Sequence, residues 1–575
     1  MSIQENTKSS EPVYEITEQR DVFIPMRDGI RLAADIYLPD SEGKFPALLA
    51  FAPYGKELQR LHFTFPPQAR PSHLWDGCIE AGNTNYIVPR GYVHVVADIR
   101  GTGYSEGTYA GFMNTGGGKI GQDGYDLVEW IAQQPWCNGK VGMVGVSYYA
   151  SAQVLVAGEQ PPSLKAIFPI GGHYDVYTMN YHGGILWLMP RAAMEGRGGD
   201  SGIARNNVHS SMKDKLSEEE FEHIVQERLS DPDIMNYPNL YHLLKYPQGR
   251  EVFLDIVLNP FNGPFYTENQ PAAKLDKINI PVYTGNNWGR PWTMRDAIDC
   301  YQEVKGPKKL ALQPAPPMQE RPFHEFHDLM IRWYDYWLKG IDNGIMDEPP
   351  ISVYVEGIGE WRQVQEWPPA AVNLEKFYLR TREKLSLDPE PFNTEIVPPD
   401  GFYQAPLTVS TTVQSVQYKT SPLPEEIEVA GDTALHIFAS IDNDDTNWMV
   451  KLYDVDPSGK KVMFTTGWLK ASHREIDENK STPGHPYHPH MKAEPVKPNE
   501  IYEYKIYTGP VARVFKKGHC IELVIKNMES PVEPELALLP PDGFHLNTSR
   551  PVTHKIFRDK NYPSHLVLPI VSKNS

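Results

Sequence analysis

Hydrophobic and polar positions alternate in blocks along the first half of the chain. Short apolar runs at 46–52, 92–97 and 165–170 are typical of strands that are buried on both faces of a sheet. Between them, residues 124–133 place their apolar side chains on one face of a helix. This alternation of strands and helices predicts an α/β fold with a mostly parallel sheet covered by helices.

The pattern changes further along the chain. Residues 217–229 form a charged helical pattern that begins with Ser-Glu-Glu-Glu, which indicates a helical insertion in the sheet domain. After residue 346, short alternating strands appear, beginning at 351–355, with turns rich in Asp, Gly and Pro between them. Evenly spaced short strands of this kind predict an all-β sandwich or jelly roll.

We therefore divide the chain into five segments. They are a disordered tail (1–13), the first part of the sheet domain (14–175), a helical cap (176–275), the second part of the sheet domain (276–345) and a C-terminal β jelly roll (346–575).

Composition narrows the classes of function. The 575 residues carry a net charge of −18, which argues against non-specific nucleic-acid binding and gives no support for docking on anionic membranes. The four cysteines are widely spaced and contain no CxxC pair, as expected of free thiols in a reducing compartment. We find neither a signal peptide nor a membrane-spanning stretch, and we therefore expect a cytoplasmic protein.

Ser147 is the most informative single residue. It lies in Gly-Val-Ser-Tyr-Tyr-Ala (145–150), between an apolar strand and a helical segment. A serine on a sharp strand-to-helix turn exposes its hydroxyl, and the next backbone N–H faces the same space, as in a nucleophile elbow. The usual pentapeptide has Gly where this chain has Tyr149, so the motif taken alone also fits an ordinary turn in an α/β sheet.

Further motifs lie on both sides of the elbow in a characteristic order. They are Met-Arg-Asp-Gly-Ile-Arg-Leu (26–32), Ala-Pro-Tyr-Gly-Lys (52–56), Asp-Ile-Arg-Gly-Thr-Gly-Tyr-Ser-Glu-Gly (98–107) and Arg-Trp-Tyr-Asp-Tyr-Trp-Leu-Lys-Gly (332–340). Together they resemble the cocaine esterase and X-prolyl dipeptidyl peptidase group of α/β-hydrolases, from about residue 21 to the C-terminus.

The resemblance implies an architecture and a set of roles. The expected fold is an α/β-hydrolase sheet with an inserted helical cap, followed by a jelly roll. Ser147 matches the family nucleophile, and the backbone N–H of Tyr148 matches one donor to the oxyanion. Tyr54, in Ala-Pro-Tyr, matches the tyrosine whose phenol is the second donor. An aromatic residue that packs at a strand end is the other interpretation of Tyr54.

Two positions depart from the family pattern. Arg290 stands in Asn-Trp-Gly-Arg (287–290), where the family has the acid of the triad. The loop that carries the family histidine reads Gln-Pro-Ala-Pro-Pro-Met (313–318) and contains no histidine. A serine hydroxyl is a weak nucleophile without a neighbouring base, so other residues must supply this role.

The following residues offer candidates for the base and the acid. His324 is our first candidate for the base and His327 the second, although both also fit the flank of the helix that begins near residue 326. Asp175 is a candidate for the acid because it follows the strand after the elbow, but an ordinary structural aspartate fits there too. Asp296 and Asp299 are further candidates, with a helix surface as their alternative, and His173 is a candidate pocket residue.

A histidine-rich loop, His-Pro-Tyr-His-Pro-His (485–490), is the remaining cluster of potential ligands. We interpret it as a packed loop that touches the hydrolase domain rather than as a metal site, because no carboxylate or cysteine is interleaved. We expect no cofactor and no metal. The expected partner is a small-molecule substrate, and homo-oligomerisation is left open.

The leading hypothesis is a serine-dependent acyl hydrolase or acyltransferase that acts on a small ester or amide. The alternative is a repurposed member of the fold that lacks the usual triad. Such a protein would catalyse a cyclisation, isomerisation or lyase step on a natural product, as in secondary metabolism, or only bind a ligand.

Overall fold

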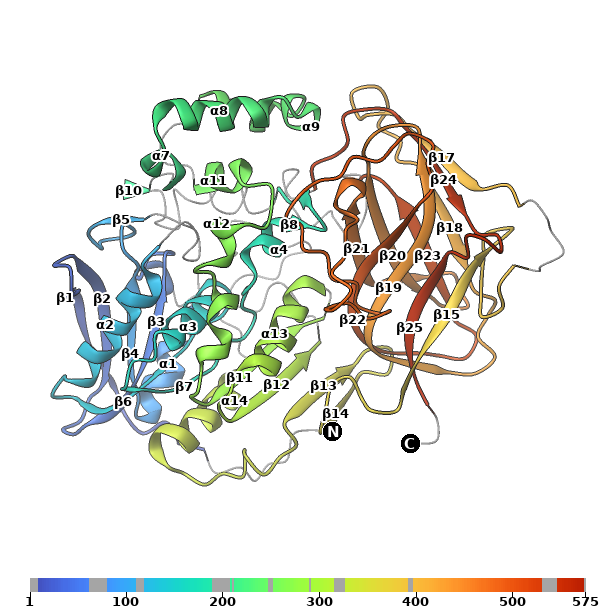
Figure 1. The fold of residues 1–575 in the computed structure, drawn as a ribbon. Coiled ribbons are helices and arrows are strands. Elements are labelled where there is room, and N and C mark those ends of the chain that lie inside the picture. Colours follow the sequence, from blue (N-terminus) through green and yellow to red (C-terminus); the bar gives the residue numbers. More distant parts are fainter. Residues whose placement is uncertain are drawn as a thin grey trace.

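The computed structural model describes residues 9–60, 80–109, 118–188, 207–208, 211–246, 252–288, 291–314, 326–390, 397–529 and 545–572. Two large sheets dominate the molecule, and a layer of helices lies above and between them (Figure 1). The expected order of a helix-covered sheet, an inserted helical segment and a β-rich C-terminal part is present.

The first sheet has ten strands in the order β1-β2-β4-β3-β6-β7-β11-β12-β13-β14. The strands from β4 to β13 in this order run parallel, and antiparallel strands, β1 and β2 on one side and β14 on the other, complete the two edges. The strands are β1 Ile16–Pro25, β2 Arg31–Pro39, β3 Phe45–Ala52, β4 Val93–Asp98, β6 Cys137–Met143, β7 Leu164–Ile167, β11 Val282–Asn287, β12 Lys308–Gln313, β13 Ile351–Val355 and β14 Glu360–Val364.

Helices cover both faces of this sheet. The connection from β3 to β4 runs one way along the strand order and that from β4 to β6 runs the other way, so right-handed crossovers place their helices on opposite faces. Tyr86 of the first of these helices stacks on His327 at a centroid distance of 5.1 Å. The helices are α1 Thr84–Ile87, α2 Ile120–Ala132, α3 Tyr148–Gly158, α13 Pro291–Glu303 and α14 His327–Tyr334, which continues as a π-helical turn, Asp335–Lys339.

The cap leaves the sheet after β7 and returns at β11, and these two strands are neighbours, with Ile167 opposite Val282. Ser217 caps α8 as predicted: its hydroxyl accepts the N–H of Glu220, whose carboxylate accepts the N–H of Ser217. The elements of the cap are α4 Val176–Asn180, β8 Tyr181–His182, β9 Ile185–Leu186, β10 Asn207–Val208, α7 Ser211–Lys215, α8 Glu218–Leu229, α9 Pro232–Met235, α10 Pro238–Lys245, α11 Val252–Leu258 and α12 Pro264–Thr267. Strand β10 pairs with β5 Thr108–Tyr109 of the sheet domain.

The C-terminal part is an almost wholly antiparallel sheet. Its apolar faces bury a core separate from that of the first sheet, with Leu435, Trp448 and Leu523 inaccessible to solvent. The strands are β15 Val372–Arg380, β16 Lys384–Ser386, β17 Asp400–Gln404, β18 Ser415–Lys419, β19 Ile427–Ile441, β20 Asn447–Val455, β21 Lys461–Lys470, β22 Tyr502–Phe515, β23 Cys520–Lys526, β24 Val552–Phe557 and β25 His565–Val571.

The prediction that Ile351–Val355 begins the C-terminal sheet is wrong. This strand, β13, lies parallel to β12 in the first sheet, with Ile351 opposite Leu310. Its alternating burial identifies a half-buried strand but does not reveal its partner, and the edge of β12 supplies one. Beyond β13, Glu356 exchanges backbone hydrogen bonds of 2.9 Å with Ala512 and Val514, which joins the two sheets.

The predicted disorder of residues 1–13 is also wrong for the last residues of that segment; residues 1–8 lie outside the described part. Ser10 donates its backbone N–H and its hydroxyl to the carboxylate of Asp335, both at 2.6 Å. Asp335 is fully buried and also accepts the hydroxyl of Tyr92 at 2.6 Å. A buried carboxylate needs such donors, and the polar tail provides two of them.

A cap hairpin is anchored in the C-terminal sheet. In the hairpin β8–β9, the carbonyl of Gly183 accepts the N–H of Lys470, and the carbonyl of Leu186 accepts the N–H of Leu546, each at 2.8 Å. In the same hairpin, the side chain of His182 is hydrogen-bonded to that of His545. The hairpin therefore connects the cap to the C-terminal part of the chain, which is distant from it in the sequence.

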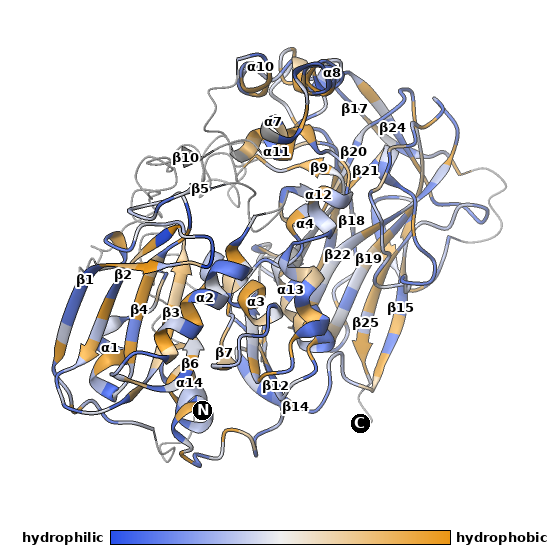
Figure 2. Cartoon of the chain, turned by 60° about the vertical axis from the view of Figure 1, so that its left-hand side comes forward, coloured by the Kyte–Doolittle hydropathy of each residue, from blue (hydrophilic) through white to orange (hydrophobic). Residues whose placement is uncertain are grey.

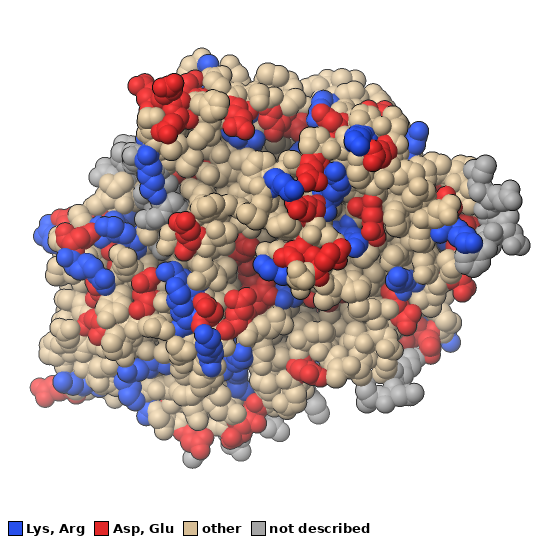
Figure 3. Space-filling view, in the orientation of Figure 1, with Lys and Arg blue, Asp and Glu red and all other residues tan. Residues whose placement is uncertain are grey.

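Hydropathy and charge follow this architecture. Apolar residues concentrate on the strands and on the inner sides of the helices (Figure 2). Basic and acidic side chains are interspersed over the face in view, with acidic ones gathered over α8 (Figure 3). Among the helices that the structure describes, none combines the length and the apolar character needed to cross a bilayer.

Candidate active site

Ser147 occupies a strained turn between β6 and α3. Its backbone has φ 60° and ψ −121°, a conformation that side-chain-bearing residues rarely adopt. Two backbone hydrogen bonds hold the turn. The N–H of Val146 donates to the carbonyl of Glu80 at 3.0 Å, and the N–H of Ser147 donates to the carbonyl of Ile170 at 3.3 Å. Gly145, with φ 113°, is required because a Cβ there would collide with Tyr149. The predicted elbow is therefore present in the backbone.

This strain predicts a gain in stability for Ser147→Gly. Glycine accepts the positive φ freely, so relief of about 1–3 kcal/mol of strain should outweigh its extra chain entropy of roughly 0.5–1 kcal/mol. We expect the free energy of unfolding to rise by about 1 kcal/mol in equilibrium denaturation. Ser147→Ala is the matched control, since it keeps the Cβ and should bring no such gain. Equal stability of the two variants would contradict the strain.

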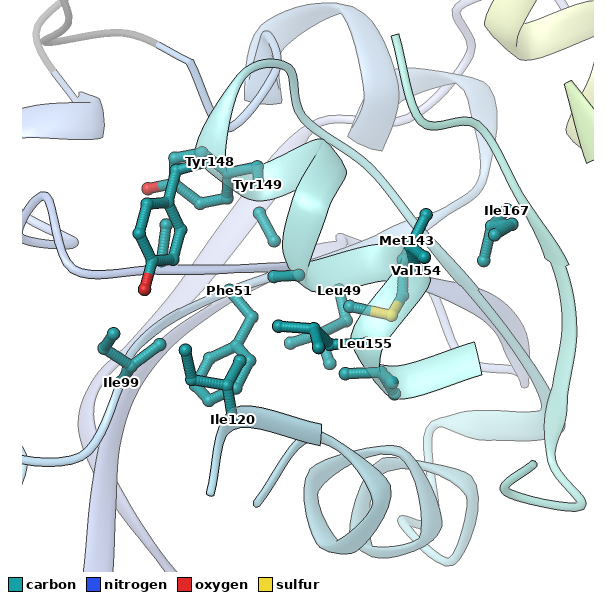
Figure 4. Close-up of a cluster of buried hydrophobic side chains, with 14 of the residues drawn as sticks. Leu49, Phe51, Ile99, Ile120, Met143, Tyr148, Tyr149, Val154, Leu155 and Ile167 are labelled. Carbon is teal, nitrogen blue, oxygen red and sulfur yellow. The ribbon is translucent and has the colours of Figure 1, made fainter. Parts of the chain in front are cut away.

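The helix that follows the elbow fixes the position of Tyr148. Helix α3 is buried along its whole length, and Val154 and Leu155 pack with strand residues such as Leu49 (Figure 4). Tyr148 is the first residue of this helix, and N–H groups of a first helical turn lack acceptors within the helix and face anions favourably. The Tyr148 phenol is turned away into a hydrogen bond of 2.9 Å with that of Tyr109. The backbone N–H of Tyr148, not its phenol, thus belongs to the elbow.

Tyr54 lies beside the elbow, as its predicted role requires. It follows the end of β3, the strand next to β6, and its ring is half-buried. The ring meets that of Tyr148 edge-on at a centroid distance of 5.8 Å and that of Tyr149 at 6.2 Å. The structure therefore brings together three of the predicted site residues, Ser147, Tyr148 and Tyr54, at the carboxyl ends of adjacent parallel strands.

The candidates for the base are placed differently. His324 lies outside the described residues, as does Arg290. His327 is buried at the start of α14, where its ring stacks on Tyr86. His173 is also buried, and its backbone N–H and carbonyl bond the hydroxyl of Ser151, one helical turn after Ser147. These two bonds attach the backbone of His173 to α3 close to the elbow.

The candidate acids serve backbone groups. Asp175 caps α4 by accepting the N–H of Thr178 at 3.1 Å. A helix surface, the alternative interpretation of Asp296, is wrong: this side chain is buried and accepts the N–H groups of Tyr174 and Asp175. Burial, reinforced by the charge of Asp175, raises the pKa of Asp296 well above its usual range. Asp299 is ion-paired with Arg295, which also pairs with Asp432 of the C-terminal sheet.

The histidine-rich loop has separate partners for each imidazole. His485 packs on Tyr507, His488 bonds the carbonyl groups of Glu475 and Lys505, and His490 lies 3.2 Å from His473 between ring nitrogens. Within the described residues, no cluster of three potential metal ligands forms. The loop contacts the cap through the carbonyl of His490, which accepts the N–H of Asn262 at 3.0 Å.

Sequence reasoning missed the residues that hold the Tyr54 loop. Asp98, the last residue of β4, accepts the backbone N–H of Lys56 at 2.7 Å. The ammonium group of Lys56 in turn lies 2.8 Å from the buried carboxylate of Asp35. The position of Asp98 could have indicated this role, because Asp98 ends the strand next to the one that leads to Tyr54.

The family model described as X-Pro dipeptidyl-peptidase (S15 family) matches residues 28–316, half of the chain. The chain belongs to this S15 family. A second model, the X-Pro dipeptidyl-peptidase C-terminal non-catalytic domain, matches residues 343–567. Its start lies close to the predicted boundary at 346, although β13 and β14 complete the first sheet.

Known relatives align with this chain over nearly its whole length. The cocaine esterase of a Rhodococcus species is 24% identical, with 96% of this chain and 98% of that protein covered. A CocE/NonD family hydrolase from Staphylococcus aureus has a TM-score of 0.75 at 22% identity and covers 97% of this chain and 94% of that one. An α-amino acid ester hydrolase has a TM-score of 0.73 at 19% identity, with 99% and 98% covered. These structures establish a shared fold.

Proposed function

We propose that this protein is a serine hydrolase that cleaves a small ester or amide, with Ser147 as its nucleophile. The observation that carries the proposal is the positive φ of Ser147 at the turn from β6 into α3. Such strain is retained at functional sites, and here it presents a hydroxyl beside a helix N-terminus. Membership of the S15 family supports a hydrolase over the repurposed, non-hydrolytic alternative.

The proposed reaction follows from the positions of the groups. The Ser147 oxygen attacks the carbonyl carbon while a base removes its proton, and the carbonyl oxygen takes up the negative charge. The N–H of Tyr148 and the phenol of Tyr54 donate hydrogen bonds to this oxyanion. The leaving group departs with a proton, and water then releases the acyl group from Ser147.

The base remains part of the proposal. We assign it to the segment that contains His324, with His327 as the alternative, because this segment follows β12, the strand beside the one that ends near Arg290. The backbone bonds of Asp175 and Asp296 favour structural roles for both carboxyl groups. We also propose that the C-terminal sheet is a jelly roll and that the helical segment after β7 sets the choice of substrate.

Labelling with a fluorophosphonate probe tests the function. We expect the wild-type protein to be labelled and peptide mapping to place the adduct on Ser147, because the probe traps activated serine hydroxyl groups. Ser163→Ala provides a matched control, since Ser163 bonds Glu129 at the far end of β7. The proposal fails if Ser147→Ala is labelled as strongly as wild type, or if the folded wild-type protein is not labelled.

A further inference from the structure

Asp98 connects the loop that carries Tyr54 to the neighbouring strand. It ends β4, where it lies opposite Ala52, the last residue of β3. One oxygen of its carboxylate accepts the N–H of Lys56 at 2.7 Å, and the other accepts the N–H of Tyr104 at 3.2 Å. The hydrogen bond from Lys56 thus fixes the loop two residues after Tyr54.

The space around this carboxylate is closed. Asp98 is 1% exposed, and the backbone of Gly103 lies directly against it with φ 50°. A Cβ on Gly103 would overlap the carboxylate, so this loop can approach only as glycine. Because its surroundings are this closely packed, the Asp98 side chain cannot change its hydrogen bonds unless the surrounding backbone moves.

Lys56 is held at its other end as well. Its ammonium group lies 2.8 Å from Asp35 on β2 and 2.6 Å from Asp21 on β1, and only 1% of its side chain is exposed. Tyr54 therefore lies between two fixed points, the end of β3 and a lysine anchored through both its backbone and its side chain. This arrangement restricts where the phenol of Tyr54 can lie.

The surroundings of Asp98 also affect its protonation. The groups that face it are Lys56 and Glu57 in the loop and the phenol of Tyr149 on α3. Burial raises the pKa of Asp98 to about 6, although two backbone N–H groups and the charge of Lys56 act in the opposite direction. The carboxylate exists above this pH, and its protonated form is a weaker acceptor for the two N–H groups.

We propose that Asp98 is a positioning residue of this site: its carboxylate holds the loop from Pro53 to Lys56 and thereby places the Tyr54 phenol at the oxyanion. The inference rests on the proposed function, because it takes Tyr54 as an oxyanion donor. Its consequence is that the contribution of Tyr54 to turnover depends on the ionised form of Asp98.

A double-mutant cycle on an activated ester tests the proposal. We expect Asp98→Asn to lower kcat about tenfold with little change in KM, since one amide N–H must then face a backbone donor. In the Tyr54→Phe background the same substitution should change kcat less than twofold, because the hydroxyl to be positioned is already absent. An equal loss in both backgrounds would show a general structural effect and would overturn the inference.

Two further measurements guard against a folding defect. Asp123→Asn is the matched control: it removes a buried carboxylate that pairs with Arg100 at 2.6 Å and does not contact the Tyr54 loop. The change in kcat of this variant reports the effect of losing a buried carboxylate without any effect on that loop. The pH dependence of the ratio of kcat for wild type to that for Tyr54→Phe needs no change at Asp98. A base shared by both proteins cancels in this ratio, which we expect to fall toward one below about pH 6.

The outcomes separate the two proposals. A ratio that stays constant across this pH range overturns the positioning role, even if Ser147 is labelled by the probe. A silent Tyr54→Phe variant also overturns it, because no oxyanion contribution would then exist to be positioned. Failure of Ser147 labelling is a different result and counts against the hydrolase itself.

Discussion

Ser147→Ala is expected to lower kcat on an activated ester such as p-nitrophenyl acetate by about 10⁴-fold or more, with a small change in KM. Removal of the nucleophile from a serine hydrolase leaves only the catalysis that binding and the oxyanion donors sustain. Because the alanine retains the Cβ and the strained backbone of the elbow, the loss would reflect the hydroxyl and not the fold.

The control for this experiment is the same substitution at a serine outside the site. Ser163→Ala should retain wild-type kcat, since the hydroxyl of Ser163 bonds only Glu129 near the start of β7. Burst kinetics provides a second readout: an initial release of p-nitrophenol equal to the enzyme concentration would report the acyl-enzyme. Turnover of Ser147→Ala at the wild-type rate would exclude the nucleophile and would favour the repurposed alternative.

His545→Leu is expected to lower the free energy of unfolding by about 3–5 kcal/mol. His545 lies between the carboxylate of Glu529 at 2.9 Å and the imidazole of His182 at 2.7 Å, and all three side chains are buried. Its removal takes the imidazole partner from the buried Glu529 carboxylate, which then keeps the backbone N–H of residue 545 at 3.2 Å and the indole N–H of Trp468 at 3.4 Å. Equilibrium unfolding followed by tryptophan fluorescence should report this, because the ring of Trp468 packs against that of His545 at a centroid distance of 4.7 Å.

A second substitution determines whether the unpaired charge is the cause. Adding Glu529→Gln to His545→Leu should restore part of the lost stability, because the buried charge is then absent. His519→Leu is the matched control: its partner Asp454 keeps the guanidinium of Arg513 at 2.9 Å, so we expect a loss of about 1 kcal/mol. Purely additive losses in the double variant would contradict this explanation.

The pH dependence gives an independent check on Glu529. Burial alone would raise its pKa, but the charge and hydrogen bonds of His545 lower it to about 2. A lowered pKa means that the ionised group stabilises the fold above its ordinary pKa of 4.5 and loses this contribution as the pH falls toward 2. This part of the acid destabilisation should be missing in the double variant.

Local sequence patterns determined most of the sheet domain. The apolar run at 46–52 became β3, and the run at 92–97 became β4, each within one residue. The elbow was predictable because Gly145 and Ser147 have local reasons for their positions, namely a close approach to Tyr149 and a positive φ. Patterns of this kind reflect burial and backbone conformation, which neighbouring residues largely decide.

Tertiary structure alone decided the partners. The alternation of Ile351–Val355 indicates a half-buried strand, yet only the open edge of β12 assigns it to the first sheet. Ser10 is ordered by Asp335, a carboxylate 325 residues away. The turn at Ser147 and the place of Tyr54 beside it could thus be predicted from the sequence, whereas the contacts of Asp98 and Lys56 and the pair of His182 and His545 could not. Their roles depend on which strand ends and loops lie next to each other in the folded chain, and the pattern of hydropathy along the sequence does not predict these contacts.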